Sequence, residues 1–147
     1  MFYKLFRALL FRLSPERAHG VALSLVGTAA ALPPARWLLR QAYGAPAGAP
    51  VHALGLTFPN PVGLAAGYDK DGSAWRGLAC LGFGHLELGT VTPEPQPGNP
   101  RPRVFRLPGD KALINRMGFP SGGADMLARR LAGPRPPGLV LGVNLGK

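Results

Sequence analysis

The fold class is decided by the stretch Pro61-Val-Gly-Leu-Ala-Ala-Gly-Tyr-Asp-Lys-Asp-Gly72. Its first half, residues 61–66, is a short apolar run bounded by turn residues, which is typical of a buried parallel strand. Its second half is a turn of small and polar residues, and residues 71–81 that follow are predicted to be helical. A strand, a close turn and a helix in this order form the opening unit of an α/β fold.

The sequence after this stretch repeats the alternation. We expect a second strand over residues 84–90, a helix over 124–131 and a third strand over 139–144. Before the stretch, residues 51–58 predict a short hairpin with Leu54-Gly55 at its turn. The predicted fold class is therefore α/β with a parallel sheet, of which these three strands are the beginning.

The first 43 residues are predicted to be helical. Residues 1–13 place apolar side chains on one helical face and basic side chains off it; the apolar face comprises Phe2, Leu5, Phe6, Leu9, Leu10 and Leu13. Ser14-Pro15-Glu16 predicts the cap and first turn of a second helix, which ends at Pro33-Pro34. Residues 35–41 predict a further short helix.

This helical segment has two interpretations. A membrane span is rejected because the uncharged run of residues 18–35 contains polar residues, glycines and prolines, and the early charges argue against a secretory signal. A basic amphipathic hairpin in the headgroup region and a helix pair packed on the protein's own core both remain open.

Composition narrows the function classes. The 147 residues include 17 Lys+Arg against 7 Asp+Glu, but the basic residues gather in residues 1–50 and 99–116, while residues 51–98 are slightly acidic. Such separate patches do not resemble a continuous phosphate-tracking surface, so we expect no nucleic-acid partner. Cys80 is the single cysteine; it is expected to be buried, and it indicates a reducing compartment. Residues 44–50 are rich in Gly, Ala and Pro and are expected to be a linker.

The candidate functional residues lie at or just after the ends of the predicted strands, because the chemistry of parallel α/β folds lies at the carboxyl ends of the strands. Lys70 follows the first strand, and Thr90 and Asn144 are the last residues of the second and the third. The glycine spacings match neither a P-loop nor a dinucleotide fingerprint. His19, His52 and His85 form no metal-ligand pattern and are expected to be structural. Glu87 is expected to be a paired structural acid facing a barrel interior.

Four blocks of sequence carry a specific resemblance. They are Leu56–Gly72, Glu87–Asn99, Ile114-Asn-Arg-Met-Gly-Phe119 and Gly142-Val-Asn-Leu-Gly-Lys147. In order and spacing they resemble the quinone-linked (class 2) dihydroorotate dehydrogenases, and Ser14–His19 resembles the helical extension of that class. The resemblance implies the N-terminal portion of a TIM (β/α)8 barrel over residues 51–147, preceded by a helical membrane and quinone-access extension over residues 1–43.

The resemblance also implies an activity and a site. Such enzymes oxidise dihydroorotate to orotate in pyrimidine biosynthesis and pass electrons from FMN to a membrane quinone, which implies a peripheral location on the cytoplasmic face of the cell membrane. The positions matching flavin contacts are Ala66, Gly67, Tyr68, Asp69, Lys70, Thr90 and Asn144. The positions matching orotate contacts are Lys70, Asn115, Arg116, Met117, Gly118 and Phe119.

Two departures from the family pattern qualify these expectations. Pro120-Ser121-Gly122 stands where some members have an asparagine pair. A barrel of this kind needs about 250 residues, so we expect a catalytic base beyond Lys147 and an isolated chain that is inactive. The alternative is a self-contained basic protein that binds membrane surfaces or nucleic acid and only inherited these motifs.

Overall fold

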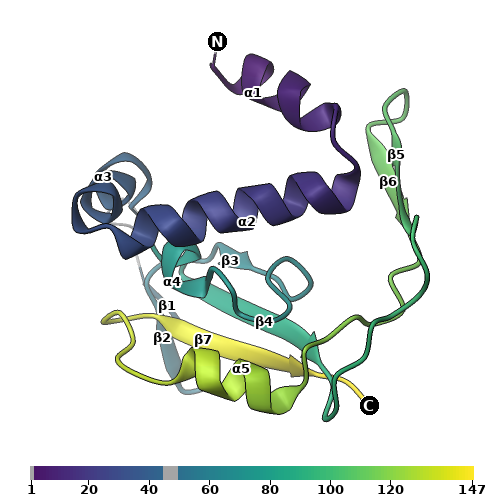
Figure 1. Cartoon of the computed structure of the whole chain (residues 1–147). Coiled ribbons are helices and arrows are strands. Elements are labelled where there is room, and N and C mark those ends of the chain that lie inside the picture. Colours follow the sequence, from purple (N-terminus) through teal and green to yellow (C-terminus); the bar gives the residue numbers. More distant parts are fainter. Residues whose placement is uncertain (1, 45–49) are drawn as a thin grey trace.

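Three parallel strands form the central sheet of the chain, whose computed structural model describes residues 2–44 and 50–147. The strands are β3 (Gly63–Leu64), β4 (His85–Val91) and β7 (Val140–Leu145), in the order β3-β4-β7 (Figure 1). The three parallel strands are neighbours in the sheet in the order in which they occur along the chain, because β5 and β6 form a separate hairpin. This is the strand order of a barrel. The three predicted strands are confirmed, although β3 is shorter than residues 61–66.

Helices connect the parallel strands. Helix α5 (Ala124–Leu131) has the predicted bounds, whereas α4 (Trp75–Leu78) is much shorter than the predicted residues 71–81. The reason lies before α4. Gly72 has a φ of +65°, which an α-helix does not allow, and the Asp69 carboxylate accepts hydrogen bonds from the backbone N–H groups of Ser73 and Ala74 at 2.7 and 2.8 Å.

Two antiparallel hairpins flank the sheet. The predicted hairpin is confirmed as β1 (Val51–Ala53) and β2 (Leu56–Phe58), and both turn residues, Leu54 and Gly55, have positive φ. The second hairpin, β5 (Val104–Leu107) and β6 (Ala112–Asn115), was not among the predicted elements. Its signal is the Pro108-Gly-Asp-Lys111 turn between two apolar runs.

The N-terminal segment forms α1 (Phe2–Phe11), α2 (Pro15–Ala31) and α3 (Pro33–Tyr43). Ser14 is the N-cap of α2 and Glu16 lies in its first turn, as predicted, although the Ser14 side chain makes no capping hydrogen bond. No helix of the described residues is by itself long and apolar enough to cross a membrane; α2 and α3 meet the criteria only as a pair, bent by 111°. The predicted linker falls mostly on residues 45–49, outside the described residues.

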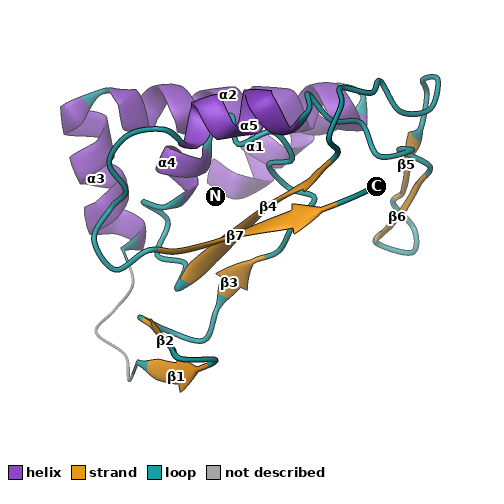
Figure 2. Cartoon of the chain, turned by 90° about the horizontal axis from the view of Figure 1, so that it is seen from below, coloured by secondary structure: helices purple, strands orange, loops and turns teal. Residues whose placement is uncertain are grey.

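The core lies between the helices and one face of the sheet (Figure 2). One cluster joins Trp75, Leu88, Val91 and Leu127; a second joins Ala74, Leu78 and Leu86, with Leu23 and Val26 of α2 packed against it. Cys80 is buried, as expected. On the opposite face, Gly63 leaves room for the His85 ring, because a Cβ there would lie 1.9 Å from it.

The two interpretations of the N-terminal segment each describe a different part of it. Helix α2 packs on the protein's own core, and the ideal Cβ of Gly77 in α4 would lie 2.5 Å from the Val26 carbonyl oxygen of α2. Helices α1 and α3 instead leave large apolar side chains in solvent; Leu5 is 65% exposed and Trp37 is 60% exposed.

Candidate functional site

The carboxyl ends of β3 and β4 meet through the backbone. The Gly67 N–H donates to the Gly89 carbonyl oxygen at 2.7 Å, which extends the pairing of the two strands beyond β3. The Ala66 N–H points at a Glu87 carboxylate oxygen at 3.4 Å. Within residues 2–44 and 50–147 no basic side chain forms an ion pair with Glu87, so the expected pairing of this acid is not found.

Thr90 and Asn144 also meet at this edge. The Thr90 hydroxyl donates to the Asn144 side-chain oxygen across the β4–β7 pair. This hydrogen bond leaves the Asn144 amide N–H groups to act as donors toward a ligand at the strand ends. The sequence therefore placed both residues correctly at the carboxyl edge of the sheet.

A cavity of about 650 Å³ lies beside this edge, between the loop after β3, helix α2 and the β5–β6 hairpin. It brings together residues that are far apart in the sequence. The predicted site residues that line it are Gly67, Tyr68, Asp69, Lys70, Asn115 and Met117. Arg116, Gly118 and Phe119 are not among its lining residues, and neither are Ala66, Thr90 and Asn144.

Lys70 supplies the positive charge on the β3 side of this cavity. Among the described residues no carboxylate forms an ion pair with its ammonium group. Asn115, at the end of β6, supplies an amide from the opposite side. A cation and an amide that line one cavity suit an anionic ligand that also carries hydrogen-bonding groups.

Asp69 has a structural role that the sequence did not reveal. It is buried, and its carboxylate accepts hydrogen bonds from Ser73 and Ala74, which fixes the loop that carries Lys70. Tyr68 packs edge-on against His19 of α2, with ring centroids 4.9 Å apart. His19 was expected to be structural, yet it lines the cavity as well.

The loop after β6, residues 116–121, is held by hydrogen bonds to residues before β5 and to the end of β4. The Arg116 backbone N–H donates to the Arg103 carbonyl oxygen at 2.8 Å, and its guanidinium reaches the Pro102 carbonyl oxygen at 3.3 Å. Phe119 has a φ of +51° and an exposed side chain. The Ser121 hydroxyl is buried and accepts the N–H of Thr92, so Ser121 joins this loop to the end of β4.

Arg103, like His19, is a site residue that the sequence did not predict. Its guanidinium donates to the carbonyl oxygens of Pro97, Asn99 and Met117 and pairs with Glu16 of α2 at 2.9 Å. It therefore ties the helical segment to the loop that carries Met117. The sequence gives only a weak indication of this role, because nothing distinguishes Arg103 from the other basic residues of residues 99–116.

A second, larger cavity continues from the first. It has a volume of about 1070 Å³ and lies between α1, α2 and the β5–β6 hairpin. The two cavities share Pro15, His19, Tyr68 and Leu113. Arg106 closes one wall by donating to the carbonyl oxygens of Leu10 and Leu13 at the end of α1.

Comparison with known proteins shows the family to which the chain belongs. The family model described as Dihydroorotate dehydrogenase matches residues 49–147. The chain belongs to the dihydroorotate dehydrogenase family. The alternative of a membrane-surface or nucleic-acid-binding protein with inherited motifs finds no support in these comparisons.

Curated relatives extend the match to the helical segment. Dihydroorotate dehydrogenase (quinone) of Stutzerimonas stutzeri is 55% identical over 145 residues, which cover 99% of this chain and 41% of that protein. The same enzyme of Pseudomonas aeruginosa strain LESB58 is 54% identical over 145 residues, with the same coverage. The chain therefore spans about two-fifths of the length of these relatives.

Solved structures agree with the sequence comparison. The crystal structure of the Eimeria tenella dihydroorotate dehydrogenase in complex with ferulenol has a TM-score of 0.67 and 40% identity, and the match covers 90% of this chain and 36% of that one. The ligand-free form from the same organism gives a TM-score of 0.65 and 41% identity. The expected fold class is confirmed: the three parallel strands are part of a TIM barrel and follow a helical segment.

Proposed function

We propose that this chain carries the substrate edge and the quinone access of a quinone-linked dihydroorotate dehydrogenase, an enzyme that oxidises dihydroorotate to orotate in pyrimidine biosynthesis. One observation carries the proposal. Lys70 after β3 and Asn115 at the end of β6 line the same cavity of about 650 Å³, although no local sequence pattern connects them.

The residues at the carboxyl edge fit FMN. Gly67 has a φ of +100°, and a Cβ there would have no neighbour within 4 Å, so the backbone is open to a planar ring. Ala66, Gly67, Tyr68, Lys70, Thr90 and Asn144 would hold the flavin, and Asp69 would act by fixing their loop. When bound, FMN supplies two-electron acceptor chemistry.

The substrate would lie between Lys70 and Asn115. The Lys70 ammonium would attract the carboxylate of dihydroorotate or orotate and stabilise negative charge that develops beside it. The Asn115 amide would pair with a polar edge of the pyrimidine ring. Met117 would contribute an apolar wall, while Arg116, Gly118 and Phe119 would act by shaping the loop, because none of them lines the cavity.

The larger cavity fits an apolar electron acceptor. Phe6, Leu10 and Phe11 of α1 line it together with Ala18 and Ala22 of α2, and it adjoins the substrate cavity at His19 and Tyr68. A quinone entering between α1 and α2 would therefore approach the substrate cavity along the β5–β6 hairpin, past His19 and Tyr68.

We propose a peripheral location on the cytoplasmic face of the cell membrane, and the exposed apolar side chains support the membrane contact. Leu5 and Leu9 of α1 and Trp37 and Leu38 of α3 are each more than half exposed, and Lys4, Arg7, Arg36 and Arg40 lie on the same two helices. An apolar surface with adjacent basic residues favours binding at the headgroup region of anionic membranes.

The test uses a chimaera in which this chain replaces the aligned part of the Stutzerimonas stutzeri relative. We expect the chimaera to reduce a quinone with dihydroorotate and to contain flavin. Lys70→Met should abolish most of this activity, whereas Arg135→Met removes the same charge between α5 and β7, outside both cavities, and should keep it. Equal activity of the two variants would refute the role of Lys70.

A further inference from the structure

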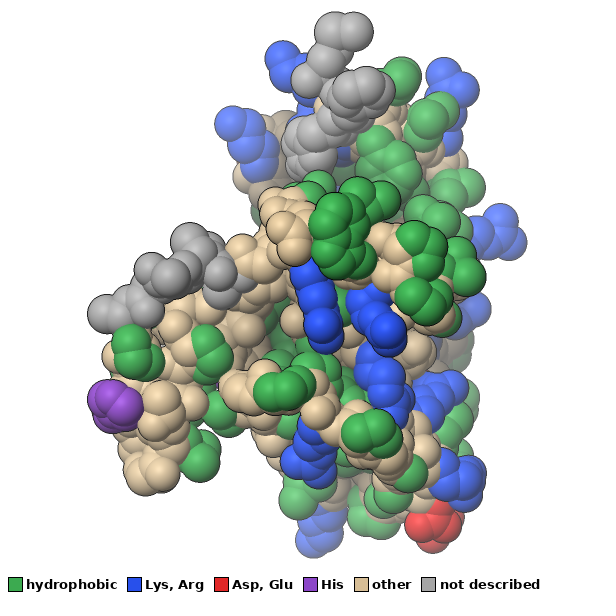
Figure 3. Space-filling model, turned by 90° about the vertical axis from the view of Figure 1, so that its left-hand side faces the viewer, with side chains coloured by type: hydrophobic (Ala, Val, Ile, Leu, Met, Phe, Trp, Pro, Cys, Tyr) green, Lys and Arg blue, Asp and Glu red, His purple; other side chains and the backbone are tan. Residues whose placement is uncertain are grey.

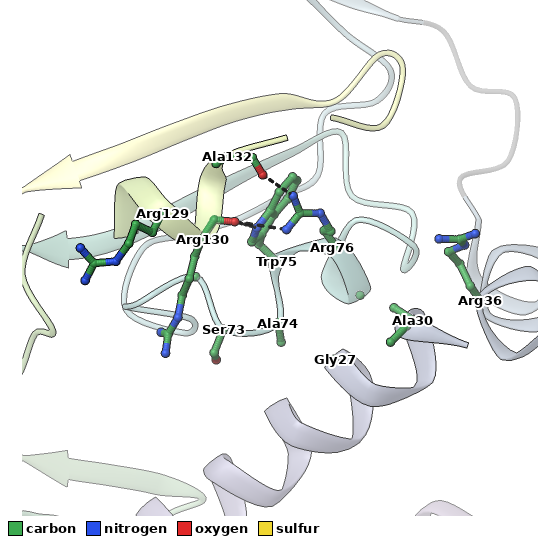
Figure 4. Close-up of a pocket in the computed structure, with 13 residues that line it drawn as sticks. Gly27, Ala30, Arg36, Ser73, Ala74, Trp75, Arg76, Arg129, Arg130 and Ala132 are labelled. Atoms are coloured by element: carbon green, nitrogen blue, oxygen red, sulfur yellow. Dashed lines mark hydrogen bonds between the residues drawn. The ribbon is translucent and has the colours of Figure 1, made fainter. Parts of the chain in front are cut away.

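A third cavity, of about 400 Å³, lies where α2, α3, α4 and α5 meet (Figure 4). Its lining contains no Asp or Glu but four arginines: Arg36, Arg76, Arg129 and Arg130. None of the four lines the substrate cavity or the larger cavity beside it. The proposed dehydrogenase function therefore leaves this group of cations without a role.

Arg76 and Arg130 are held in place by neutral groups. The Arg76 guanidinium lies 4.2 Å from the centre of the Trp75 ring and donates to the carbonyl oxygens of Arg130 at 3.2 Å and Ala132 at 2.7 Å. Arg130 donates to the Asp71 carbonyl oxygen at 2.9 Å. Carbonyl oxygens fix the guanidinium groups without neutralising their charge, so the cations are positioned in advance.

Arg36 and Arg129 are unpaired. In the described part of the chain neither side chain has a carboxylate within ion-pair distance. Figure 4 shows Arg36 extending from α3 toward the side of the cavity that holds Arg76. The surrounding surface adds to the positive field, because on the face that carries α3 the Lys and Arg side chains gather and acidic groups are confined to its edge (Figure 3).

Four arginines contribute to the lining, although the Arg129 side chain extends away from Arg76 and Arg36 in Figure 4. Their like charges repel one another, and an anion in the cavity would relieve this repulsion. Guanidinium groups favour phosphate in particular, since their N–H pairs match two phosphate oxygens at once. We propose that this cavity is a binding site for a phosphate group. Because Trp37 and Leu38 on the neighbouring α3 are exposed, the phosphate has two possible sources: an anionic lipid headgroup or a free phosphorylated molecule.

The test compares two double variants of the full 147-residue chain. Arg36→Gln with Arg76→Gln removes two cations of the cavity. Arg17→Gln with Arg135→Gln removes the same charge outside the cavity, and neither residue lies on α1 or α3, the helices proposed to contact the membrane. The probes are pyrophosphate, measured by calorimetry, and phosphatidylglycerol vesicles, measured by sedimentation against phosphatidylcholine vesicles, all at one ionic strength.

We expect the cavity variant to weaken binding of at least one probe tenfold or more, and the control variant to weaken it less than twofold. Arg36→Lys with Arg76→Lys keeps the charge and should restore part of the affinity. An effect on vesicles alone identifies the lipid headgroup, and an effect on pyrophosphate identifies free phosphate. Equal losses in the cavity and control variants, or no saturable binding of either probe, would overturn the proposal. Thermal unfolding of each variant verifies that the fold is kept.

Discussion

Arg103 and Glu16 form an ion pair with 2.9 Å between Nη2 and Oε1, and they join the start of α2 to the loop that carries the substrate residues. The Arg103 side chain is only 6% exposed and also donates to three carbonyl oxygens of residues 97–117. The helical segment and the barrel segment are therefore connected at the cavity itself. We therefore expect the order of the loop after Asn115 to depend on α2.

Replacing Arg103 with Met should destabilise the protein by about 2 to 3 kcal/mol, because several charge-assisted hydrogen bonds are lost and Glu16 loses its buried partner. The matched control is Arg101→Met. Arg101 also contacts Glu16, at 3.3 Å, but its side chain is 73% exposed, so its loss should cost less than about 1 kcal/mol. Urea unfolding of both variants measures the difference. Similar values for the two arginines would contradict the structural role of Arg103.

Replacing Gly77 with Ala should destabilise the contact between α2 and α4. The new Cβ would lie 2.5 Å from the Val26 carbonyl oxygen, and overpacking of this kind costs about 1 to 3 kcal/mol. Gly20→Ala on α2 is the control, because a Cβ there meets nothing within 4 Å and an alanine in a helix interior is stabilising by about 0.5 to 1 kcal/mol. Opposite signs of the change in unfolding free energy are the expected result.

Replacing Asn115 with Ala, in the chimaera described above, should weaken orotate binding about ten- to a hundredfold, since unsatisfied polar groups of the ligand cost about 1 to 3 kcal/mol. Flavin content should stay normal, because Asn115 lies on the hairpin and not at the carboxyl edge of the sheet. Titration with orotate and flavin absorbance give the two readings. Loss of flavin with unchanged orotate affinity would show that the loop was assigned wrongly.

Replacing Leu5 and Leu9 together with Ser should weaken binding to anionic vesicles by about tenfold or more, because each buried leucine contributes about 1.5 to 3 kcal/mol. Both side chains are more than half exposed, so the unfolding free energy should hardly change. The control is Leu54→Ser, which removes a 94% exposed leucine from the β1–β2 turn. If this control weakens vesicle binding as much, α1 is not the membrane contact.

Some residues of the site could be predicted from local sequence patterns, and others depend on contacts with distant parts of the chain. Lys70, Thr90 and Asn144 could be located from sequence because Lys70 follows an apolar strand and the other two lie at the ends of apolar strands, and strand ends are a local signal. Asn115 entered only through the family resemblance, since the β5–β6 hairpin that carries it was not predicted. Arg103 and His19 were missed, because their importance depends on partners in distant parts of the chain.

The sequence by itself determined the parallel strands, the bounds of α5, the Leu54-Gly55 hairpin and the start of α2 at Pro15, because hydrophobic periodicity, turn residues and proline act within a few residues. Tertiary structure alone decided that α4 shrinks to residues 75–78, that Asp69 serves the loop before it, and that Arg103 reaches Glu16. The first two outcomes depend on the positive φ at Gly72 and on the buried Asp69 carboxylate, and the third depends on the packing of α2 against the barrel segment. Local patterns cannot contain the Arg103–Glu16 pair, because 87 positions separate the two residues and the unfolded chain keeps them apart.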